Sequence, residues 1–273
     1  MTKIKDKTVL ITGGASGIGL LMGHKAIQKG AARLIILDID REALLKAVEE
    51  LSNNNCEILP LSVDLTDVSQ LRETIDGLIS RGLQVDILIN NAGVVTGKDF
   101  KDHTSEEIEH TMQVNSIAPM KLTLKLLPQM IERGSGHIVN ISSAAGMLAN
   151  PGMSVYCASK WALSGWSDSL RIEMERERTG VKVLTVTPYY IDTGMFKGVS
   201  SSVISVLKPE KVARQIINAI EKEKIVLRMP LIIYFLPFIK GILPKRLLDI
   251  VVGKIFGIYT SMNTFKGRAH DQN

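Results

Sequence analysis

The chain has 273 residues, 45% hydrophobic and 22% charged, which is enough apolar material for a large packed core and excludes wholesale disorder. Its 33 lysines and arginines exceed its 28 acids by 5, but residues 240–273 alone hold six basic residues against two acids. The tail is therefore +4 and residues 1–239 are only +1, a nearly neutral body that argues against nucleic-acid binding. The basic residues of the tail are Lys240, Lys245, Arg246, Lys254, Lys266 and Arg268.

Cysteine and histidine usage excludes further classes of protein. Cys56 and Cys157 are too few for a disulfide framework or a cysteine zinc site, and they favour a reducing, cytoplasmic compartment. The five histidines show no ligand spacing with acids or cysteines, so we expect no metal site. No uncharged stretch reaches the roughly 20 residues that span a bilayer, and the first apolar run is too short for a signal-peptide core. We expect a protein free in solution or resting on a membrane surface.

Short apolar runs alternate with longer amphipathic segments up to about residue 225. The runs predict buried strands at Thr8–Thr12, Arg33–Leu37, Glu57–Leu61, Asp86–Asn90, His137–Ser142 and Val181–Thr187. The segments between them predict helices at Gly17–Lys29, Arg41–Ser52, Val68–Ser80, Ser105–Arg133 (bent or divided by Pro119 and Pro128) and Ser154–Thr179. This alternation predicts one α/β domain with a doubly wound parallel sheet of the Rossmann type. Ligands of such sheets bind at the carboxyl ends of the strands.

A glycine-rich turn follows the first expected strand. Residues 12–19 read Thr-Gly-Gly-Ala-Ser-Gly-Ile-Gly and open a helix. Glycine permits a tight turn and close approach of a pyrophosphate, whose charge the helix N-terminus favours. The spacing is G-x-x-x-G-x-G rather than G-x-G-x-x-G, and a glycine cluster alone is weak evidence. Its place in the first strand–helix unit indicates a dinucleotide site.

Asp38 closes the second expected strand, 19 residues after Gly19. A carboxylate at this place accepts a hydrogen bond from a ribose 2′-OH and repels a 2′-phosphate. Ser16 stands where a basic residue could have met that phosphate. Arg41 is a contrary signal, which we interpret as the solvated start of the next helix. The sequence predicts NAD rather than NADP.

Tyr156 and Lys160 are four residues apart in a helical segment and so share one face. A phenol with a pKa of about 10 is a poor base at neutral pH, and a neighbouring ammonium favours the phenolate. Ser143 lies 13 residues before Tyr156, just past a strand, where its hydroxyl can polarise a substrate oxygen. Asn115 lies in the preceding helical segment. The order and spacing of all these residues, rather than one pair, predict acid–base chemistry.

Together these motifs resemble the short-chain dehydrogenase/reductase family of standard length. The matching motifs, spread over about residues 5–225, are 12–19, 90–93, Asn115, Ser143, 156–160 and Pro188 to Thr193. The resemblance implies that Tyr156 transfers the proton, Ser143 orients the substrate oxygen and Lys160 holds the nicotinamide ribose and lowers the pKa of the tyrosine. It implies that Asn115 anchors a water of the proton relay.

The resemblance also implies the cofactor contacts and the assembly. Asp64 and Leu65 would lie near the adenine, and Ile191 and Thr193 beside the nicotinamide carboxamide. The full implied set is Gly13, Ser16, Gly17, Ile18, Gly19, Asp38, Asp64, Leu65, Asn91, Ala92, Gly93, Tyr156, Lys160, Pro188, Ile191 and Thr193. Members of the family commonly form dimers or tetramers, so the resemblance implies a homo-oligomer.

Two stretches, 188–196 and 261–268, resemble a narrower branch that contains retinol dehydrogenases and 17β-hydroxysteroid-dehydrogenase-like enzymes. The family's usual glycine after Pro188 is Tyr189 here, and Tyr189 or Tyr190 either lines the substrate pocket or packs beneath the loop. We expect an NAD-dependent oxidoreductase that interconverts a lipophilic alcohol, retinoid- or steroid-like, and its aldehyde or ketone. The alternatives are an NADPH-dependent carbonyl or 3-oxoacyl reductase and an NAD-binding regulator without catalysis.

The chain divides into a dinucleotide-binding catalytic domain, residues 1–228, and an apolar, basic extension, residues 229–273. Prolines at 230, 237 and 244 argue against one long helix in the extension. One interpretation is a cap that completes the substrate pocket and packs against another subunit. The other is a segment that contacts a membrane peripherally, with its basic residues meeting anionic head groups. The two roles are compatible.

Overall fold

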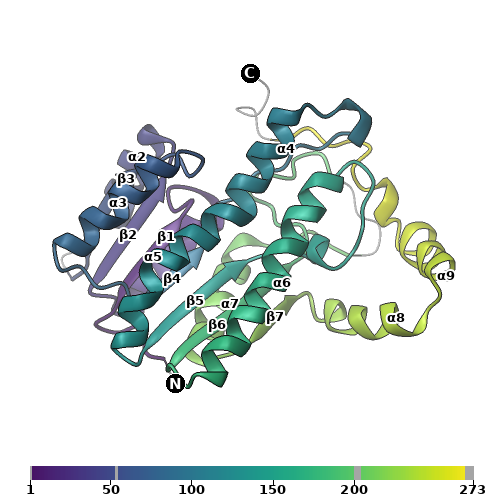
Figure 1. The fold of residues 1–273 in the computed structure, drawn as a ribbon. Helices are drawn as coiled ribbons and strands as arrows, with labels where there is room; N and C mark the ends of the chain where they lie inside the picture. Colours follow the sequence, from purple (N-terminus) through teal and green to yellow (C-terminus); the bar gives the residue numbers. More distant parts are fainter. Residues whose placement is uncertain (1, 53–54, 200–203, 268–273) are drawn as a thin grey trace.

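The computed structural model describes residues 2–52, 55–199 and 204–267, and Figure 1 shows them as a twisted sheet between helices. The sheet has seven strands, every pair of neighbours parallel, in the order β3-β2-β1-β4-β5-β6-β7. Their bounds are β1 Thr8–Thr12, β2 Arg33–Asp38, β3 Glu57–Ser62, β4 Ile87–Asn90, β5 Gly136–Ile141, β6 Val181–Pro188 and β7 Val226–Met229. The order reverses between β1 and β4, which confirms the predicted doubly wound fold and places the ligand crevice there.

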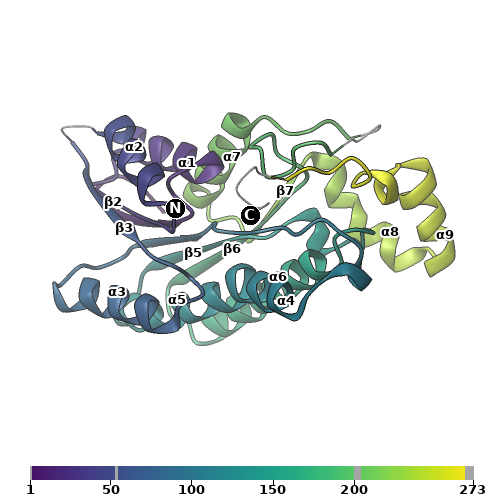
Figure 2. The same ribbon diagram turned by 90° about the horizontal axis from the view of Figure 1, so that it is seen from above.

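Helices cover both faces of the sheet, as Figure 2 shows from above. One layer contains α1 Gly17–Gln28, α2 Arg41–Leu51 and α7 Pro209–Glu221. The other contains α3 Val68–Ser80, α5 Ala118–Glu132 and α6 Ser154–Arg176, with α4 Ser105–Met112 beside α6. Because helices cover both faces of the central strands, all five residues of β1 are buried and these strands read as continuous apolar runs. The edge strand β3 was expected to be buried, but its residues are half-buried or exposed.

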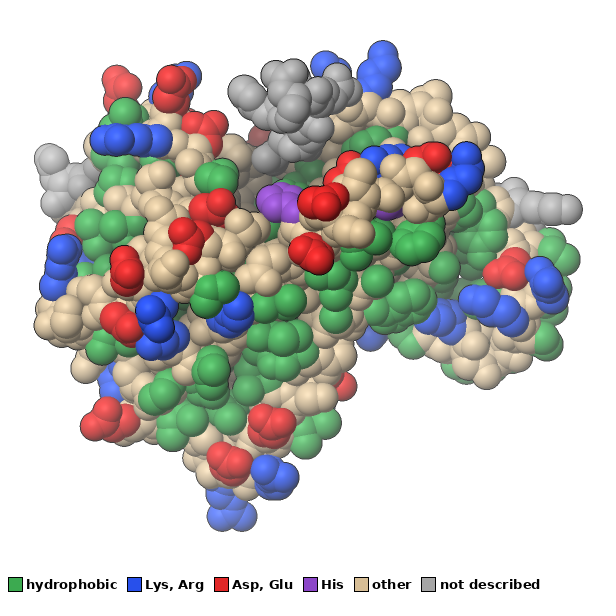
Figure 3. Space-filling model, turned by 45° about the horizontal axis from the view of Figure 1, so that its top comes forward, with side chains coloured by type: hydrophobic (Ala, Val, Ile, Leu, Met, Phe, Trp, Pro, Cys, Tyr) green, Lys and Arg blue, Asp and Glu red, His purple; other side chains and the backbone are tan. Residues whose placement is uncertain are grey.

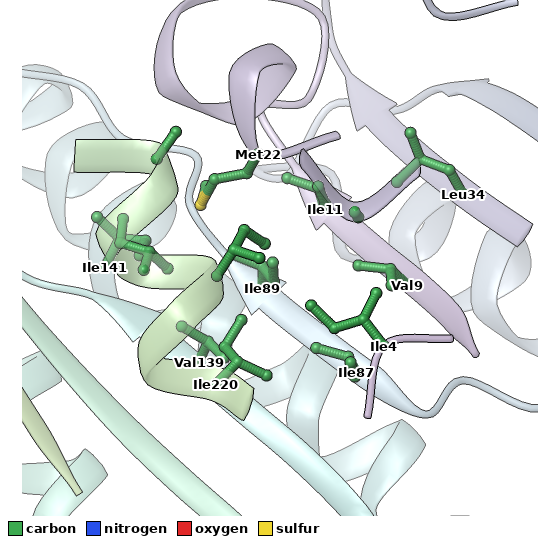
Figure 4. Close-up of a cluster of buried hydrophobic side chains, with 14 of the residues drawn as sticks. Ile4, Val9, Ile11, Met22, Leu34, Ile87, Ile89, Val139, Ile141 and Ile220 are labelled. Carbon is green, nitrogen blue, oxygen red and sulfur yellow. The ribbon is translucent and has the colours of Figure 1, made fainter. Parts of the chain in front are cut away.

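The two cores are built by alternation along each strand. Val9 and Ile11 point toward α1 and α7, where they join Met22 and Ile220 (Figure 4). Leu10, between them, points to the other face and packs with the α3 and α5 side chains, including Leu122. This period of two residues follows from the pleat and fixes which side chains support the crevice.

The helical segment expected over 105–133 is interrupted at its functional part. It consists of α4, a π-helical turn at Gln113–Ile117 and α5. Pro119 lies in the first turn of α5, where its missing N–H is tolerated, and Pro128 lies inside α5 without ending it. The wider π turn contains Asn115, which is fully buried. Such turns are frequent at functional sites.

Two elements of the sheet and the layers that cover it were not predicted from the sequence: α7 and β7. Val212, Ile216 and Ile220 of α7 follow one another at the four-residue spacing of an amphipathic helix and are buried against α1. Met229, the last residue of β7, belongs to the same core, so the sheet extends one residue beyond 228.

After the sheet, the chain forms an arm of short helices that projects past β7 in Figures 1 and 2. We call residues 231–262 the C-terminal arm. It comprises 3-10 turns at Leu231–Phe235 and Ile258–Thr260, α8 Leu236–Ile242, α9 Lys245–Asp249 and a π-helical segment Ile250–Ile255. The helical structure of the arm is interrupted before α9 at Pro244, as the prolines predicted. None of the helices within the described ranges is long and apolar enough to cross a membrane.

His137 is a buried histidine at the start of β5, away from the crevice, and it provides a pH test of the fold. Burial lowers its pKa to about 4. Below about pH 6.5 the His137 imidazole is therefore protonated in the unfolded chain but not in the folded chain, so the free energy of unfolding falls as the pH drops from 6.5 toward 4. The difference between 6.5 and 4 corresponds to about 3 kcal/mol.

We expect wild-type protein to lose up to about 3 kcal/mol more unfolding free energy than His137→Gln between pH 7 and pH 4, since the variant has no imidazole to protonate. Urea denaturation of both proteins at the two pH values measures this difference. Equal losses in the two proteins would show that His137 does not control the acid stability.

Candidate active site

The glycine-rich turn after β1 has the shape that its sequence requires. Gly13 and Gly17 have positive φ angles of 61° and 55°, which side chains rarely adopt. A Cβ atom on Gly19 would lie 2.0 Å from the backbone oxygen of Gly13. Ser16 is the exposed N-cap of α1, and its hydroxyl makes no capping hydrogen bond. The cradle and the helix N-terminus fit a pyrophosphate in both shape and charge.

Residues after β4 hold this turn from the neighbouring strand. The hydroxyl oxygen of Thr12 accepts hydrogen bonds from the backbone N–H groups of Asn91 and Ala92, each at 3.0 Å. The Asn91 amide donates to the backbone oxygens of Thr12 (2.9 Å) and Gly13 (3.0 Å). Because hydrogen bonds connect Asn91 and Ala92 to the turn, the floor of the crevice between β1 and β4 is fixed in position.

Asp38, the last residue of β2, lies beside the same turn. Its Oδ2 accepts a hydrogen bond from the Ala15 N–H at 3.1 Å, and its Oδ1 accepts one from the Asp40 N–H at 3.2 Å. Each carboxylate oxygen keeps a lone pair for a further donor. Arg41 begins α2 and is exposed, as expected for a solvated helix start.

Three further residues that were expected to contact the cofactor are Asp64, Leu65 and Ile18. Asp64 accepts hydrogen bonds at its Oδ1 from the N–H (2.8 Å) and hydroxyl (2.7 Å) of Thr66, and Leu65 packs against the core on the α3 face. Ile18 packs on the opposite core. Among the described residues, neither Asp64 nor Leu65 forms a hydrogen bond with the glycine turn.

The loop after β6 places its residues at the carboxyl edge of the sheet. Pro188 ends β6 opposite Met229 of β7. Ile191 is buried in the α1–α7 core and forms a bridge with Leu207. Thr193 is half-buried, and its N–H donates to the Ile191 oxygen at 2.9 Å. The loop is therefore anchored although Tyr189 replaces the family's glycine.

The structure brings Ser143, Tyr156 and Lys160 together. Ser143 follows β5, and its hydroxyl hydrogen-bonds with the phenol of Tyr156 on α6. The Lys160 Nζ lies 5.7 Å from the centre of the Tyr156 ring and donates to the Ile141 oxygen at 2.9 Å. Both Tyr156 and Lys160 are only 4% exposed. The neighbouring Ser142 points elsewhere, because its hydroxyl bonds to the Lys160 oxygen and to Ser164.

Asn115 borders this group from the π turn. Its Oδ1 accepts from the Val94 N–H at 2.8 Å, and its Nδ2 donates to the Val94 oxygen (2.9 Å) and to Ser159 Oγ (3.0 Å). A methyl group added to Gly93 would lie 3.3 Å from Asn115 Oδ1 and 3.4 Å from Lys160 Nζ. The two side chains thus border the same space beside Gly93, so the four predicted catalytic residues form one site.

Burial changes the acid–base properties of this site. It raises the pKa of Tyr156 above the usual value, while the hydrogen bond with Ser143 acts in the opposite direction. Burial also lowers the pKa of Lys160 to about 8. The expectation that Lys160 lowers the tyrosine pKa is therefore not met in the protein alone, since desolvation outweighs other effects. The phenol is held protonated, ready to donate.

A cavity of about 390 Å³, part of it open to solvent, adjoins Ser143. Its walls are mainly apolar and aromatic: Ser143, Ala144, Ala145, Leu148, Asn150, Met153, Tyr189, Tyr190, Phe196 and Ile258. Tyr189 and Tyr190 both line the cavity and pack edge to face, with ring centres 4.6 Å apart, so both interpretations of these residues hold. The Tyr190 hydroxyl bonds to Asn150 Nδ2 (2.9 Å) and Ser261 Oγ (3.0 Å).

Sequence reasoning missed several residues of this cavity. Asn150 and Met153 lie in the loop between Ser143 and Tyr156, a position that could have suggested them. Ile258 comes from the C-terminal arm, and no local pattern indicated it. As for metals, within the described ranges no group of three or more histidines, cysteines and acids is placed to hold one.

Comparisons with known proteins agree with this geometry. The model of the short chain dehydrogenase family matches residues 7–203. Epidermal retinol dehydrogenase 2 from Mus musculus is 34% identical over 271 residues, which cover 97% of this chain and 87% of that protein. Estradiol 17-beta-dehydrogenase 11 from Homo sapiens is 31% identical over 267 residues, covering 97% of this chain and 89% of that protein.

A solved structure shares the fold as well. The short-chain dehydrogenase from Sphingobium yanoikuyae in complex with NADPH superposes with a TM-score of 0.76 at 28% identity, covering 82% of this chain and 88% of that one. Fold, family model and relatives agree, and they confirm the resemblance to the retinol and hydroxysteroid dehydrogenase branch. The chain belongs to the short-chain dehydrogenase/reductase family of oxidoreductases.

Proposed function

We propose that the protein is an NAD-dependent oxidoreductase that interconverts a lipophilic alcohol, retinoid- or steroid-like, and its aldehyde or ketone. The observation that carries the proposal is the buried Ser143–Tyr156–Lys160 group, whose Ser143 lines a mainly apolar cavity. A bound nicotinamide supplies or accepts the hydride. The protein supplies position, a proton and an apolar environment.

Each catalytic residue has a role that its contacts support. In the reducing direction Tyr156 donates its phenolic proton to the substrate oxygen, since burial favours the protonated form. In the oxidising direction the deprotonated phenol accepts that proton from the alcohol. Ser143, hydrogen-bonded to that phenol, holds the same oxygen. Lys160 holds the nicotinamide ribose. Asn115 anchors a relay water through the second lone pair of its Oδ1, which borders the space next to Lys160 Nζ.

Asp38 supports NAD as the cofactor. Its carboxylate lies within hydrogen-bond distance of the glycine turn and would repel a 2′-phosphate. The glycine turn, Ser16, Asn91 to Gly93, Asp64, Leu65 and the 188–193 loop complete the proposed binding surface. A second candidate, an NADPH-dependent carbonyl reductase, is favoured by one observation: the Sphingobium yanoikuyae relative was solved with NADPH.

The C-terminal arm supports the lipophilic substrate class. Its Ile258 lines the cavity, and Leu148, from the loop between Ser143 and Tyr156, packs with Leu236 and Leu248 of the arm. We assign the chain up to β7 to the catalytic domain and the arm to a cap that also touches lipid. The buried, free Cys56 and Cys157 fit a cytoplasmic enzyme. By family, we infer a homo-oligomer.

A substrate panel tests this function. Retinol, a hydroxysteroid, a long-chain alcohol and a small polar alcohol are each oxidised with NAD or NADP in parallel, and turnover is read as reduced cofactor. We expect turnover of a lipophilic alcohol and an NAD preference of at least about tenfold, equal to about 1.4 kcal/mol.

Three results would contradict the proposal. Preference for NADP would favour the reductase alternative. Turnover of the polar alcohol alone would exclude the lipophilic substrate class. Binding of NAD without turnover of any alcohol would indicate a regulator that keeps the fold.

A further inference from the structure

We propose that the outer face of the C-terminal arm docks on an anionic lipid surface. This inference deepens the proposed function, on which its link to a lipophilic substrate rests. The docking face combines exposed apolar side chains of the arm with basic residues, which favour a negatively charged lipid. The arm lies at the right of Figure 3, where hydrophobic and basic side chains stand next to each other.

The first half of the arm is apolar on two opposite faces. The inner face packs Ile233 and Leu236 against the body. The outer face has the spacing of one helix stripe, with Leu231 77%, Phe235 63%, Phe238 69% and Ile242 61% exposed. Leu247 and Ile250, further along the arm, are also exposed, at 46% and 47%. A helix that is apolar all round is normally covered on every side, so we expect this face to have a partner.

The charges next to the stripe favour an anionic partner. Lys245 and Arg246 begin α9 and are exposed, and neither forms an ion pair with another described residue. The nearby acid, Asp249, accepts a hydrogen bond from the Tyr259 hydroxyl at 2.8 Å. Basic residues that flank an exposed apolar face are the arrangement that binds anionic head groups while apolar side chains enter the acyl boundary.

Not every basic residue of the tail takes part. Lys240 turns inward, because its Nζ donates to the Met147 oxygen and lies 4.9 Å from the centre of the Trp161 ring. Lys240 therefore fixes the arm to the body instead of facing lipid. The side chain of Lys254 and the whole of Arg268 lie outside the described residues. Lys245 and Arg246 are the basic residues that we assign to the docking face.

A lipid surface fits this face better than a second copy of the chain. A two-fold interface presents the same patch to itself. It would set Lys245 and Arg246 against a patch whose described acid, Asp249, already has a hydrogen-bond partner. An anionic bilayer instead supplies the opposite charge and an apolar phase together. The arm then rests on the membrane while its Ile258 borders the cavity, so a lipophilic substrate has a short path to Ser143.

Vesicle co-sedimentation of the full chain tests the proposal. Vesicles of phosphatidylcholine alone are compared with vesicles that contain phosphatidylserine. The apolar variant is Phe235→Ser/Phe238→Ser, and the charge variant is Lys245→Gln/Arg246→Gln. The matched control is Leu124→Ser on α5, which removes an equally exposed side chain (72%) from a distant surface.

We expect wild type and the Leu124→Ser control to bind the anionic vesicles alike. Each arm variant should lower the partition coefficient about tenfold, and 0.5 M salt should weaken wild type but not the charge variant. Thermal melts and NADH binding confirm that the variants fold. Turnover of the best water-soluble alcohol separates the two proposals, because arm variants should keep it.

Two results would overturn the inference. One is equal partition of wild type and the folded Phe235→Ser/Phe238→Ser variant. The other is a fall in the solution mass of that variant, by light scattering, with unchanged vesicle binding, which would assign the face to a second copy. If the wild-type protein turned over none of the alcohols, the proposed function would be contradicted, but the proposal of lipid binding would be unaffected.

Discussion

Replacing Tyr156 by phenylalanine is expected to lower kcat about 1000-fold while NADH still binds. The variant loses only the hydroxyl that hydrogen-bonds with Ser143 and that burial keeps protonated. The ring itself, which packs edge to face on Phe196 with centres 5.9 Å apart, is retained, so the pocket wall stays in place. Steady-state turnover and NADH fluorescence titration measure the two effects separately.

Tyr190→Phe is the matched control for this prediction. It also removes one buried phenol from the same buried cluster, but that hydroxyl bonds to Asn150 and Ser261 rather than to Ser143. We expect kcat of this control to stay within about tenfold of wild type, since no proton transfer is lost. A Tyr156→Phe enzyme with a tenth or more of wild-type kcat would exclude Tyr156 as the proton donor.

Gly19→Ala is expected to weaken NAD binding at least about 100-fold and to destabilise the fold by about 3 kcal/mol. The added Cβ would lie 2.0 Å from the Gly13 oxygen and 2.8 Å from Asn91 Nδ2. The first of these atoms is backbone, so the turn itself has to move. Because Asn91 and Gly13 shape the crevice between β1 and β4, the cofactor cradle moves with it.

Calorimetric titration with NAD and urea denaturation check this prediction. Gly165→Ala on α6 is its control, because a Cβ there meets nothing within 4 Å and alanine stabilises a helix by up to about 1 kcal/mol relative to glycine. Gly165→Ala should bind NAD like wild type. Unchanged NAD affinity in Gly19→Ala would show that the turn does not hold the cofactor.

Strands and helices were predictable where burial leaves a period in the sequence. Thr8–Thr12 and Val68–Ser80 have the bounds that were expected. The interruption at 113–117 was not predictable, because a π turn differs from an α turn only in its hydrogen bonds. The helix 209–221 was missed although its apolar spacing and its N-terminal proline were present.

The site was predictable where chemistry depends on spacing along one element. Tyr156 and Lys160 share a helix face as expected, and Ser143 meets the phenol. The pKa shift of Tyr156 was not predictable from the sequence, since the direction of the shift depends on how completely the fold removes water from the hydroxyl. Ile258 is more than a hundred residues from Ser143, so only tertiary packing reveals it.

The C-terminal arm is attached at neighbouring points. Where it leaves the sheet, the Met229 oxygen accepts a hydrogen bond from the Tyr189 N–H at 2.8 Å. Where it returns, Ser261 Oγ lies 3.0 Å from the Tyr190 hydroxyl. The two ends of the arm are thus attached by hydrogen bonds to adjacent residues of the cavity wall. Any displacement of the arm would therefore act directly on Tyr189 and Tyr190, two side chains that line the cavity.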